Sequence, residues 1–347
     1  MVLHCRIYDL PEGEALLISL PGLPDLLDEV HAFLGAHFRW EKAGKENTAQ
    51  SVWRLGVACG SGSWREEVRA ETPFTAEENG ATPVLGFVEE GNGSFWLTDA
   101  EAGTRVRWNL KEKTLEVFYQ NAGHTVVEAI YTSVRTLVYS LLAKRGARLM
   151  HASVVSYRGK AVLLLGEKGA GKTTLASAML EAGAQFLASD RCWIWRGADS
   201  WQVVGWMGTF RLRPEDFWQL FRASTAASLE AFAESARTCE SNYFAGKLRC
   251  PPLTFLQLGG WQAAYQAPLH ALVELKPSDS GFGLFRDGES SILSLQAHQV
   301  HRRLPPPLAP SPNVAPIWPD RVVERWTYRG RRPPQLMARE LCQWLEP

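Results

Sequence analysis

The sequence predicts a protein of the α/β class, α+β overall, in which an N-terminal α+β domain precedes a second domain built on a mixed sheet. Three observations lead to this prediction. The chain has 347 residues, of which 46% are hydrophobic, and this is enough to bury two separate cores. Apolar and polar residues alternate over positions 95–120. From position 161, an apolar run, a glycine-rich turn and a helical pattern follow one another.

The N-terminal domain is expected at residues 1–130. Residues 23–38 (LPDLLDEVHAFLGAHF) repeat apolar side chains at helical spacing, which predicts a helix. Residues 95–120 form three alternating runs separated by short turn-forming segments, the pattern of an antiparallel meander. This part of the chain carries no motif for chemistry.

The second domain is expected at residues 131–347. A helix at 132–145 has its apolar residues on one face and Gly146 at its C-terminal cap, and it is predicted to join the two domains. Residues 149–157 and 161–165 flank a turn and predict a hairpin whose second strand is buried on both faces.

The pattern then continues as helix and strand. A short helix at 174–182 ends before a glycine, and a strand at 184–190 ends on an aspartate. Prolines exclude helix and central strand from residues 304–320, which predicts an extended surface segment. Residues 335–346 predict a C-terminal amphipathic helix.

Composition excludes several classes of partner. Lysine plus arginine equals aspartate plus glutamate at 37 each, so we expect neither nucleic acid nor a membrane surface as a partner. The six cysteines form no CxxC pair, which favours a reducing, cytoplasmic location. No basic segment followed by a long apolar run occurs at the N-terminus, and no continuous apolar stretch of membrane-spanning length is present.

One motif points to chemistry. Residues 166–173 match the pattern G-x-x-x-x-G-K-[ST], in which glycines let backbone N–H groups face phosphate oxygens, and the next helix directs its positive end at the same anion. We expect Lys172 to bridge the β- and γ-phosphates of ATP or another nucleoside triphosphate, and Thr173 to offer its hydroxyl to Mg²⁺. The predicted nucleotide-binding residues are Gly166, Glu167, Lys168, Gly169, Ala170, Gly171, Lys172, Thr173 and Thr174.

Two further residues are candidates for catalysis. Asp190 lies eighteen residues after Lys172 at the end of an apolar strand, where its carboxylate can face Mg²⁺ or the incoming nucleophile; a turn-capping surface aspartate is the alternative. His151 stands near the start of the predicted hairpin. If the hairpin pairs about its turn, His151 lies near residues 165–167 and so near the loop; a structural histidine is the alternative.

Arg211 and Arg213 alternate on one face of a further predicted strand. Two such cations can stabilise charge on a transferring phosphoryl group. A solvated strand face is the alternative, because arginine is mostly exposed.

The stretch LMHASVVSYRGKAVLLLGEKGAGKTTLASAMLEAGAQFLASD resembles the HPr kinase/phosphorylase superfamily, specifically the HPr-kinase-related serine kinases of bacterial gene clusters, including those for lasso peptides. The likeness covers His151-Ala152, the glycine-rich loop, Gly183 and the acidic end of the following strand. Outside residues 130–195 it reaches only GTFRLRPEDF, which is similar to the family's arginine-containing segment.

The resemblance implies a phosphoenolpyruvate-carboxykinase-like fold, ATP with Mg²⁺, and a homo-oligomer. The family usually ends the strand with two aspartates, one acting as base or acid on the hydroxyl and the other near Mg²⁺. Here Ser189 occupies the first position and Asp190 the second. Serine cannot accept a proton as a carboxylate does, so Asp190 does both jobs, His151 helps, or catalysis is impaired.

The resemblance and the motif together predict an ATP-dependent kinase that transfers the γ-phosphoryl group to a serine-type hydroxyl of a peptide or protein, including a ribosomally made peptide precursor. The N-terminal domain would then recognise the substrate. Two alternatives stay open, because the motif specifies the donor and not the acceptor. One is a small-molecule kinase, free serine included, and the other is a nucleotide-binding or regulatory protein without catalysis.

Overall fold

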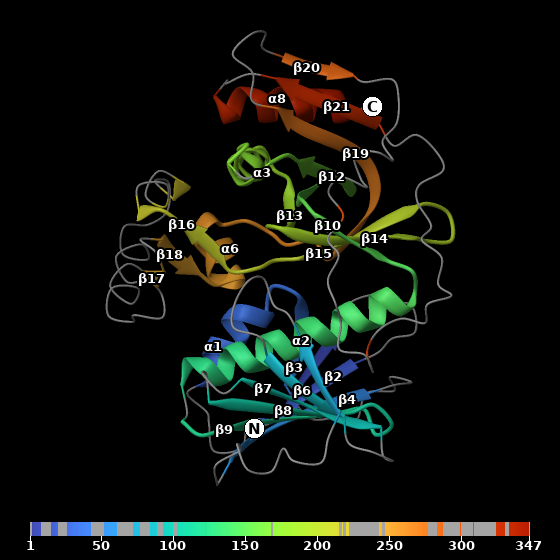
Figure 1. The fold of residues 1–347 in the computed structure, drawn as a ribbon. Helices are drawn as coiled ribbons and strands as arrows, with labels where there is room; N and C mark the ends of the chain where they lie inside the picture. Colours follow the sequence, from blue (N-terminus) through green and yellow to red (C-terminus); the bar gives the residue numbers. More distant parts are fainter. Residues whose placement is uncertain are drawn as a thin grey trace. The chain divides into compact units, whose positions relative to one another are not determined.

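The structure is a computed structural model that describes residues 2–7, 15–19, 26–42, 52–60, 72–76, 84–88, 93–99, 103–121, 123–167, 169–214, 217, 220–221, 243–244, 247–276, 283–286, 299, 308, 324–329 and 333–346. The chain divides into two compact units, drawn in Figure 1. Unit 1 comprises Met1–Lys144 with Arg302–Pro312, and unit 2 comprises Arg145–His301 with Asn313–Pro347. The division falls after Lys144, the last residue of a helix, and the boundary expected at residue 130 lies within the same helix.

In its described residues, unit 1 is a nine-stranded sheet with two helices. The strands are β1 (Val2–Ile7), β2 (Ala15–Ser19), β3 (Phe38–Lys42), β4 (Val52–Cys59), β5 (Thr72–Ala76), β6 (Val84–Val88), β7 (Ser94–Asp99), β8 (Thr104–Asn109) and β9 (Thr114–Tyr119). Their order is β3-β1-β2-β4-β9-β8-β7-β6-β5, and β4 is parallel to both of its neighbours. The predicted meander is confirmed, since β7, β8 and β9 pair antiparallel in sequence.

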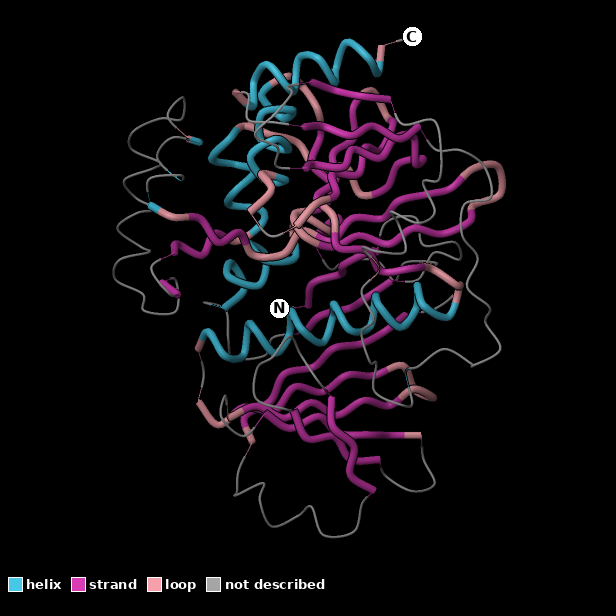
Figure 2. The backbone as a smooth tube through the Cα atoms, turned by 45° about the horizontal axis from the view of Figure 1, so that its top comes forward, coloured by secondary structure: helices cyan, strands magenta, loops and turns pink. Residues whose placement is uncertain are grey.

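Helices α1 (Leu26–Leu34) and α2 (His124–Lys144) pack together, and α2 lies across β8 and β9 (Figure 2). The core between them includes Phe95 and Trp108, whose rings stack at 5.5 Å. Helix α2 begins earlier than the predicted 132, because Val127 and Ile130 continue its buried face. By length and mean hydropathy (1.3) α2 meets the criteria for a membrane span, but 67% of that apolar window is buried in the structure, as in a core helix.

Unit 2 contains a mixed sheet, so the protein is of mixed α/β class. Its strands are β10 (Arg148–His151), β11 (Ser153–Tyr157), β12 (Lys160–Leu165), β13 (Gln185–Ala188), β14 (Arg191–Arg196), β15 (Trp201–Trp206), β19 (Gln266–Lys276), β20 (Gly283–Arg286) and β21 (Glu324–Arg329). The order is β10-β14-β15-β19-β12-β11-β13, and β21 pairs with β19 and β20. Strand β19 is parallel to β12 and β21 and antiparallel to β15. A smaller sheet joins β16 (Phe210–Leu212), β18 (Lys247–Cys250) and β17 (Tyr243–Phe244).

The helices in the described part of unit 2 are α3 (Lys172–Glu181), α6 (Pro252–Gly259) and α8 (Pro334–Leu345). Helix α8 corresponds to the helix predicted at 335–346, and its apolar face packs against α3. Arg158 Nη2, in the turn between β11 and β12, donates a hydrogen bond to Glu346 Oε1 at 2.8 Å just after α8. The C-terminal helix thereby covers the helix that follows the glycine-rich loop (Figure 1).

Of the predicted extended segment 304–320, only Leu308 lies within the described residues. Its carbonyl oxygen accepts a hydrogen bond from Ser140 Oγ of α2 at 3.0 Å, and its side chain is buried.

The predicted strand 149–157 is two strands. Strand β10 pairs with β14, whereas β11 pairs with β12 in the expected hairpin, and Ala152 separates the two. The first half of the predicted strand pairs with β14 and not with β12. No local sequence pattern identifies β14 as its partner. This change determines where the candidate site forms.

Candidate functional site

The glycine-rich loop, residues 166–171, connects β12 to α3. Gly166 has φ +145, and a Cβ there would approach the carbonyl oxygen of Leu275 on β19 to 2.9 Å, so only glycine fits. Gly171 has φ +94 and is the N-cap residue of α3, where Leu175 N donates to its carbonyl oxygen at 2.9 Å. The loop therefore ends with the N-terminus of a helix, where backbone N–H groups are free to bind an anion.

The predicted nucleotide-binding residues differ in exposure along this loop. Gly166 is buried; Ala170, Gly171, Lys172 and Thr173 are half-buried; Glu167, Gly169 and Thr174 are exposed. Lys168 lies outside the described residues.

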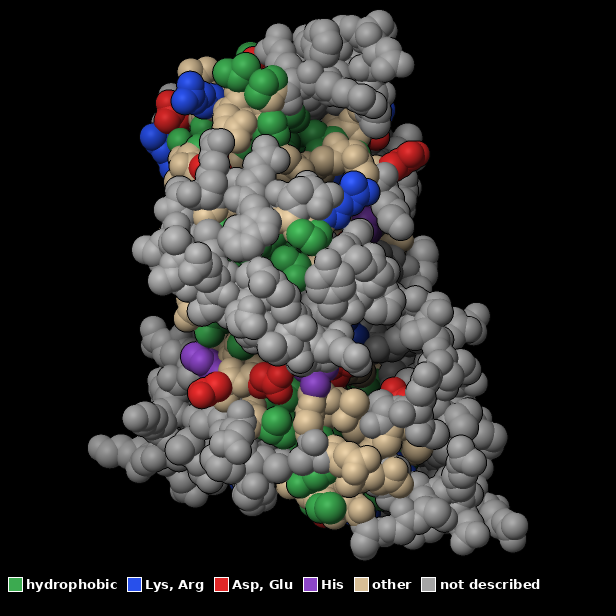
Figure 3. Space-filling model, turned by 90° about the vertical axis from the view of Figure 1, so that its left-hand side faces the viewer, with side chains coloured by type: hydrophobic (Ala, Val, Ile, Leu, Met, Phe, Trp, Pro, Cys, Tyr) green, Lys and Arg blue, Asp and Glu red, His purple; other side chains and the backbone are tan. Residues whose placement is uncertain are grey.

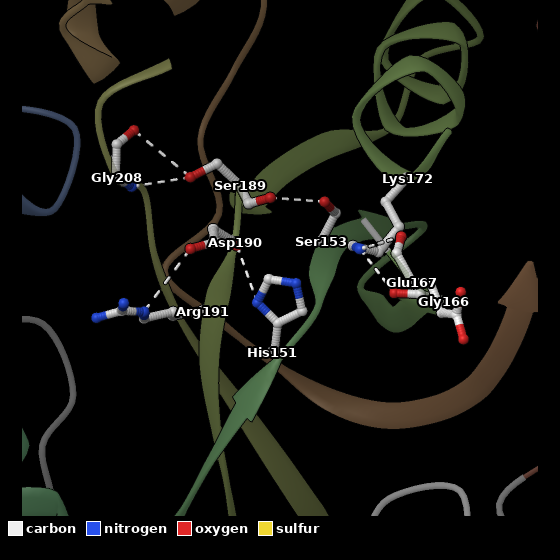
Figure 4. A network of polar contacts seen from close by, with 9 residues as sticks. All are labelled: His151, Ser153, Gly166, Glu167, Lys172, Ser189, Asp190, Arg191 and Gly208. Carbon is white, nitrogen blue, oxygen red and sulfur yellow. Dashed lines mark hydrogen bonds and ion pairs between the residues drawn. The ribbon is translucent and has the colours of Figure 1, made fainter. Parts of the chain in front are cut away.

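Lys172 folds over the loop. Its ammonium group donates to the carbonyl oxygens of Gly166 at 2.7 Å and Glu167 at 3.1 Å (Figure 4). Burial lowers the pKa of Lys172 below its ordinary value, and the charge of Asp190 opposes this shift. Asp190 is therefore close enough to Lys172 for its charge to favour the ammonium form.

His151 and Asp190 form a pair, with His151 Nδ1 at 3.0 Å from Asp190 Oδ1. Arg191 Nε lies 3.7 Å from the other carboxylate oxygen, Oδ2. Burial acts to raise the pKa of Asp190, but the hydrogen bond and charge of His151, followed by the charges of Arg191 and Lys172, outweigh it, and the pKa lies below its ordinary value. The carboxylate is therefore ionised at neutral pH.

Strand register brings this pair together. His151 at the end of β10 is the register partner of Arg191 at the start of β14, and Val154 of β11 is the partner of Ala188 of β13. Between these two ladders, Ala152 N donates to the carbonyl oxygen of Asp190 at 3.1 Å. The β10–β14 ladder and the β11–β13 ladder are thus separated by a short irregular stretch, Ala152 facing Asp190, and the candidate site lies at this stretch.

This geometry corrects the expected route to the site. The hairpin does pair about its turn, but its ladder ends at Ser153, opposite Leu164, so His151 does not belong to it. The contact of His151 with the site comes from β14 and Asp190 instead.

The structure also adds Ser153 and Arg191, which the sequence did not single out, and it gives the contacts of Ser189, which the sequence did. Ser153 Oγ donates to the carbonyl oxygen of Ser189 at 2.6 Å, and Ser189 Oγ accepts from Gly208 N at 2.9 Å. Arg191 was adjacent to Asp190 in the sequence, and that adjacency was the only local signal for its role. The hydroxyl of Ser153 carried no such signal, and the position of Ser189 in the sequence did not indicate its contact with Gly208.

Of the two predicted phosphate-stabilising arginines, Arg213 follows β16 and has an exposed side chain. The backbone of Arg211 lies in β16 opposite Arg249 of β18, and its side chain lies outside the described part of the chain.

The donor set suits Mg²⁺ held jointly with phosphates. Thr173 and Asp190 offer a hydroxyl and an ionised carboxylate, which are the oxygen ligands Mg²⁺ prefers. Within the described ranges, no group of three or more His, Cys, Asp or Glu side chains is placed to hold a metal. Mg²⁺ at phosphoryl-transfer sites takes few protein ligands and completes its shell with substrate phosphates and water, so this sparse set fits.

No protein-family model and no curated protein matches the chain. Among solved structures, the HPr(Ser) kinase/phosphatase from Coxiella burnetii is similar, with 13% sequence identity and a TM-score of 0.30. The likeness covers 58% of this chain and 99% of that one. At such low similarity the likeness does not indicate which atoms react here. The chemistry of the site therefore rests on its own side chains.

Proposed function

We propose that this protein is a kinase that transfers the γ-phosphoryl group of ATP, or of another nucleoside triphosphate, to a serine-type hydroxyl of a peptide or protein. One observation carries the proposal. The lysine of a glycine-rich loop folds over that loop at the N-terminus of a helix, and an aspartate whose charge acts on this lysine pairs with a histidine at 3.0 Å. This combination suits phosphoryl transfer, which depends on positioning the phosphates and handling one proton.

The glycine-rich loop and Lys172 would bind the triphosphate. Helix α3 directs its N-terminus at the loop, so the backbone N–H groups there favour phosphate oxygens. Lys172 Nζ would exchange the carbonyl oxygens of Gly166 and Glu167 for the β- and γ-phosphates. Thr173 and Asp190 would hold Mg²⁺, which when bound neutralises charge on those phosphates.

The His151–Asp190 pair would handle the acceptor. The acceptor oxygen forms a bond to the γ-phosphorus while the bond from that phosphorus to the β–γ bridging oxygen breaks, and the nucleoside diphosphate leaves. The hydroxyl proton passes to the pair, with Asp190 orienting or deprotonating the hydroxyl and His151 contacting phosphate or assisting the transfer. The lowered pKa of Asp190 keeps the carboxylate ionised, which suits it to orient the hydroxyl as a hydrogen-bond acceptor.

For the rest of the molecule we propose that unit 1 recognises the acceptor, that a ribosomally made peptide precursor is one such acceptor, and that the protein works in the cytoplasm as a homo-oligomer. A small molecule such as free serine is a second acceptor class. Ser189 favours a further candidate, a nucleotide-binding protein without catalysis, because its side chain is turned to Gly208 and leaves Asp190 as the carboxylate at the end of this strand.

Incubation with γ-labelled ATP, Mg²⁺ and a panel of serine-containing peptides, proteins and free serine tests the proposal. We expect label on one acceptor class, and a loss of about 10²-fold or more in rate in Asp190→Asn. Asp199→Asn, at an exposed turn aspartate of the same unit, serves as the matched control and keeps the wild-type rate. ATP binding with no labelled product would favour the non-catalytic candidate, and a wild-type rate in Asp190→Asn would refute the catalytic assignment.

A further inference from the structure

Both hydrogen bonds of the Ser189 hydroxyl go to the backbone of one residue, Gly208. Ser189 Oγ accepts a hydrogen bond from Gly208 N at 2.9 Å and donates one to Gly208 O at 3.5 Å. Its own carbonyl oxygen accepts from Ser153 Oγ at 2.6 Å. Figure 4 shows the Ser189 side chain directed at Gly208, away from Lys172 and the glycine-rich loop. The residue thus ties together three segments of unit 2.

The segment that Ser189 holds is the connection from β15 to β16, residues 207–209. Its far end is anchored as well, because Phe210 is buried and its ring stacks on Phe255 of α6 at 3.6 Å. Phe210 also lies 5.4 Å from the ring of Phe186, on the strand β13 that leads directly to Ser189. Ser189 thus contacts the connection at Gly208, and Phe186 of the preceding strand contacts Phe210 at its far end.

We propose that Ser189 is a positioning residue that clamps the 207–209 connection beside Asp190, and that its hydroxyl does not stand in for a catalytic carboxylate. The chemistry of the contact supports this. A hydroxyl can accept from an N–H group and donate to a carbonyl oxygen at once, whereas a carboxylate only accepts and would face the Gly208 oxygen with like charge. The clamp fixes the entry of β16 next to the residue that would handle the acceptor.

Hydrogen exchange at the Gly208 amide tests the clamp without reference to activity. In Ser189→Ala we expect this amide to exchange about tenfold faster or more, because its acceptor is gone. Ser189→Thr retains a hydroxyl and should keep the protection. Ser200→Ala, which removes a hydroxyl from the turn between β14 and β15, is the matched control and should leave Gly208 unchanged. Unchanged exchange at Gly208 in Ser189→Ala would overturn the clamp.

The effect on turnover rests on the proposed function and is measured separately, as phosphate release from ATP with Mg²⁺ and water as the acceptor. We expect Ser189→Ala to lower kcat about tenfold with the KM for ATP within about twofold, because the connection shifts while the glycine-rich loop does not. Ser189→Thr restores kcat, and Ser189→Asp lowers it too.

Two further outcomes are informative. Faster turnover in Ser189→Asp than in wild type would identify Ser189 as the site of a missing carboxylate and overturn the proposal. Wild-type protein that binds no nucleotide would refute the proposed function instead, and the exchange rate of Gly208 would still decide the clamp.

Discussion

Gly205 in β15 lies where this strand approaches β13, and replacing it with alanine tests the packing that supports the site. A Cβ at Gly205 would overlap the carbonyl carbon and oxygen of Leu187 and come within 3.0 Å of its Cα. These are backbone atoms of a neighbouring strand, which cannot swing aside as the end of a side chain does. Overpacking of this kind costs roughly 1–3 kcal/mol, and a rigid neighbour places the cost near the upper end.

The alanine also brings a small gain, because glycine in a strand is less stable than alanine by roughly 0.5–1 kcal/mol. The net loss for Gly205→Ala is therefore about 2 kcal/mol, which for a domain of this size lowers Tm by about 4–8 °C. Differential scanning calorimetry measures this shift. The reasoning would be refuted by a Tm within about 1 °C of wild type, because β13 and β15 would then have room for a methyl group.

Gly56 in β4 provides the matched control. It is also a glycine within a strand, but a Cβ there meets nothing within 4 Å. We expect Gly56→Ala to leave Tm unchanged or to raise it slightly. If both variants lose stability equally, the loss comes from replacing a strand glycine as such and not from the contact with Leu187.

Two other measurements follow from the charges. Lys172→Met removes the cation that folds over the loop, and we expect ATP affinity to fall about tenfold or more by calorimetric titration, whereas Lys276→Met at an exposed lysine of β19 does not change it. In unit 1, acidic and histidine side chains lie side by side on the face drawn in Figure 3. The carboxylates of Glu128 and, to a smaller extent, Glu29 accept hydrogen bonds from His124 and raise its pKa to about 9 against the effect of burial. The stabilisation of the fold by protonated His124 is fully present below the unfolded pKa of about 6.5 and is lost as pH rises through about 9. The contacts are 3.4 and 3.5 Å long and the glutamates are 43% exposed, so we expect the free energy of unfolding in urea titrations to fall by roughly 1–2 kcal/mol over this range. This fall should be absent from His124→Gln.

Much of the fold could be predicted because its signals are local. The meander of β7 to β9 alternates within each strand, and the sequence of strand, glycine-rich loop and helix is legible from residue 161 onward. The start of α2 was placed too late, since Val126 and Val127 are β-branched and weak helix formers. The burial of these two side chains against the sheet of unit 1 outweighs their weak intrinsic helix propensity.

The candidate site depends on pairings that no local pattern encodes. His151 was expected beside the loop through the hairpin, but its strand leaves that hairpin at Ala152 and pairs with β14. Counting along the chain identified Ser189 as the place of a missing carboxylate. The direction of its side chain is determined by Gly208, nineteen residues further on, and such a long-range contact has no signature in a single sequence.

Because the candidate site lies between two strand ladders, its geometry is also independent of the turns nearby. His151 ends β10 and Asp190 immediately precedes β14, and these two strands pair in fixed register. The distance between the two residues therefore does not depend on the turn at residues 158–159 or on the turn at 197–200. Short insertions at either turn should leave the pair unchanged. These two turns are therefore suitable positions for a fluorescent reporter or a spin label when the site is studied in the working protein.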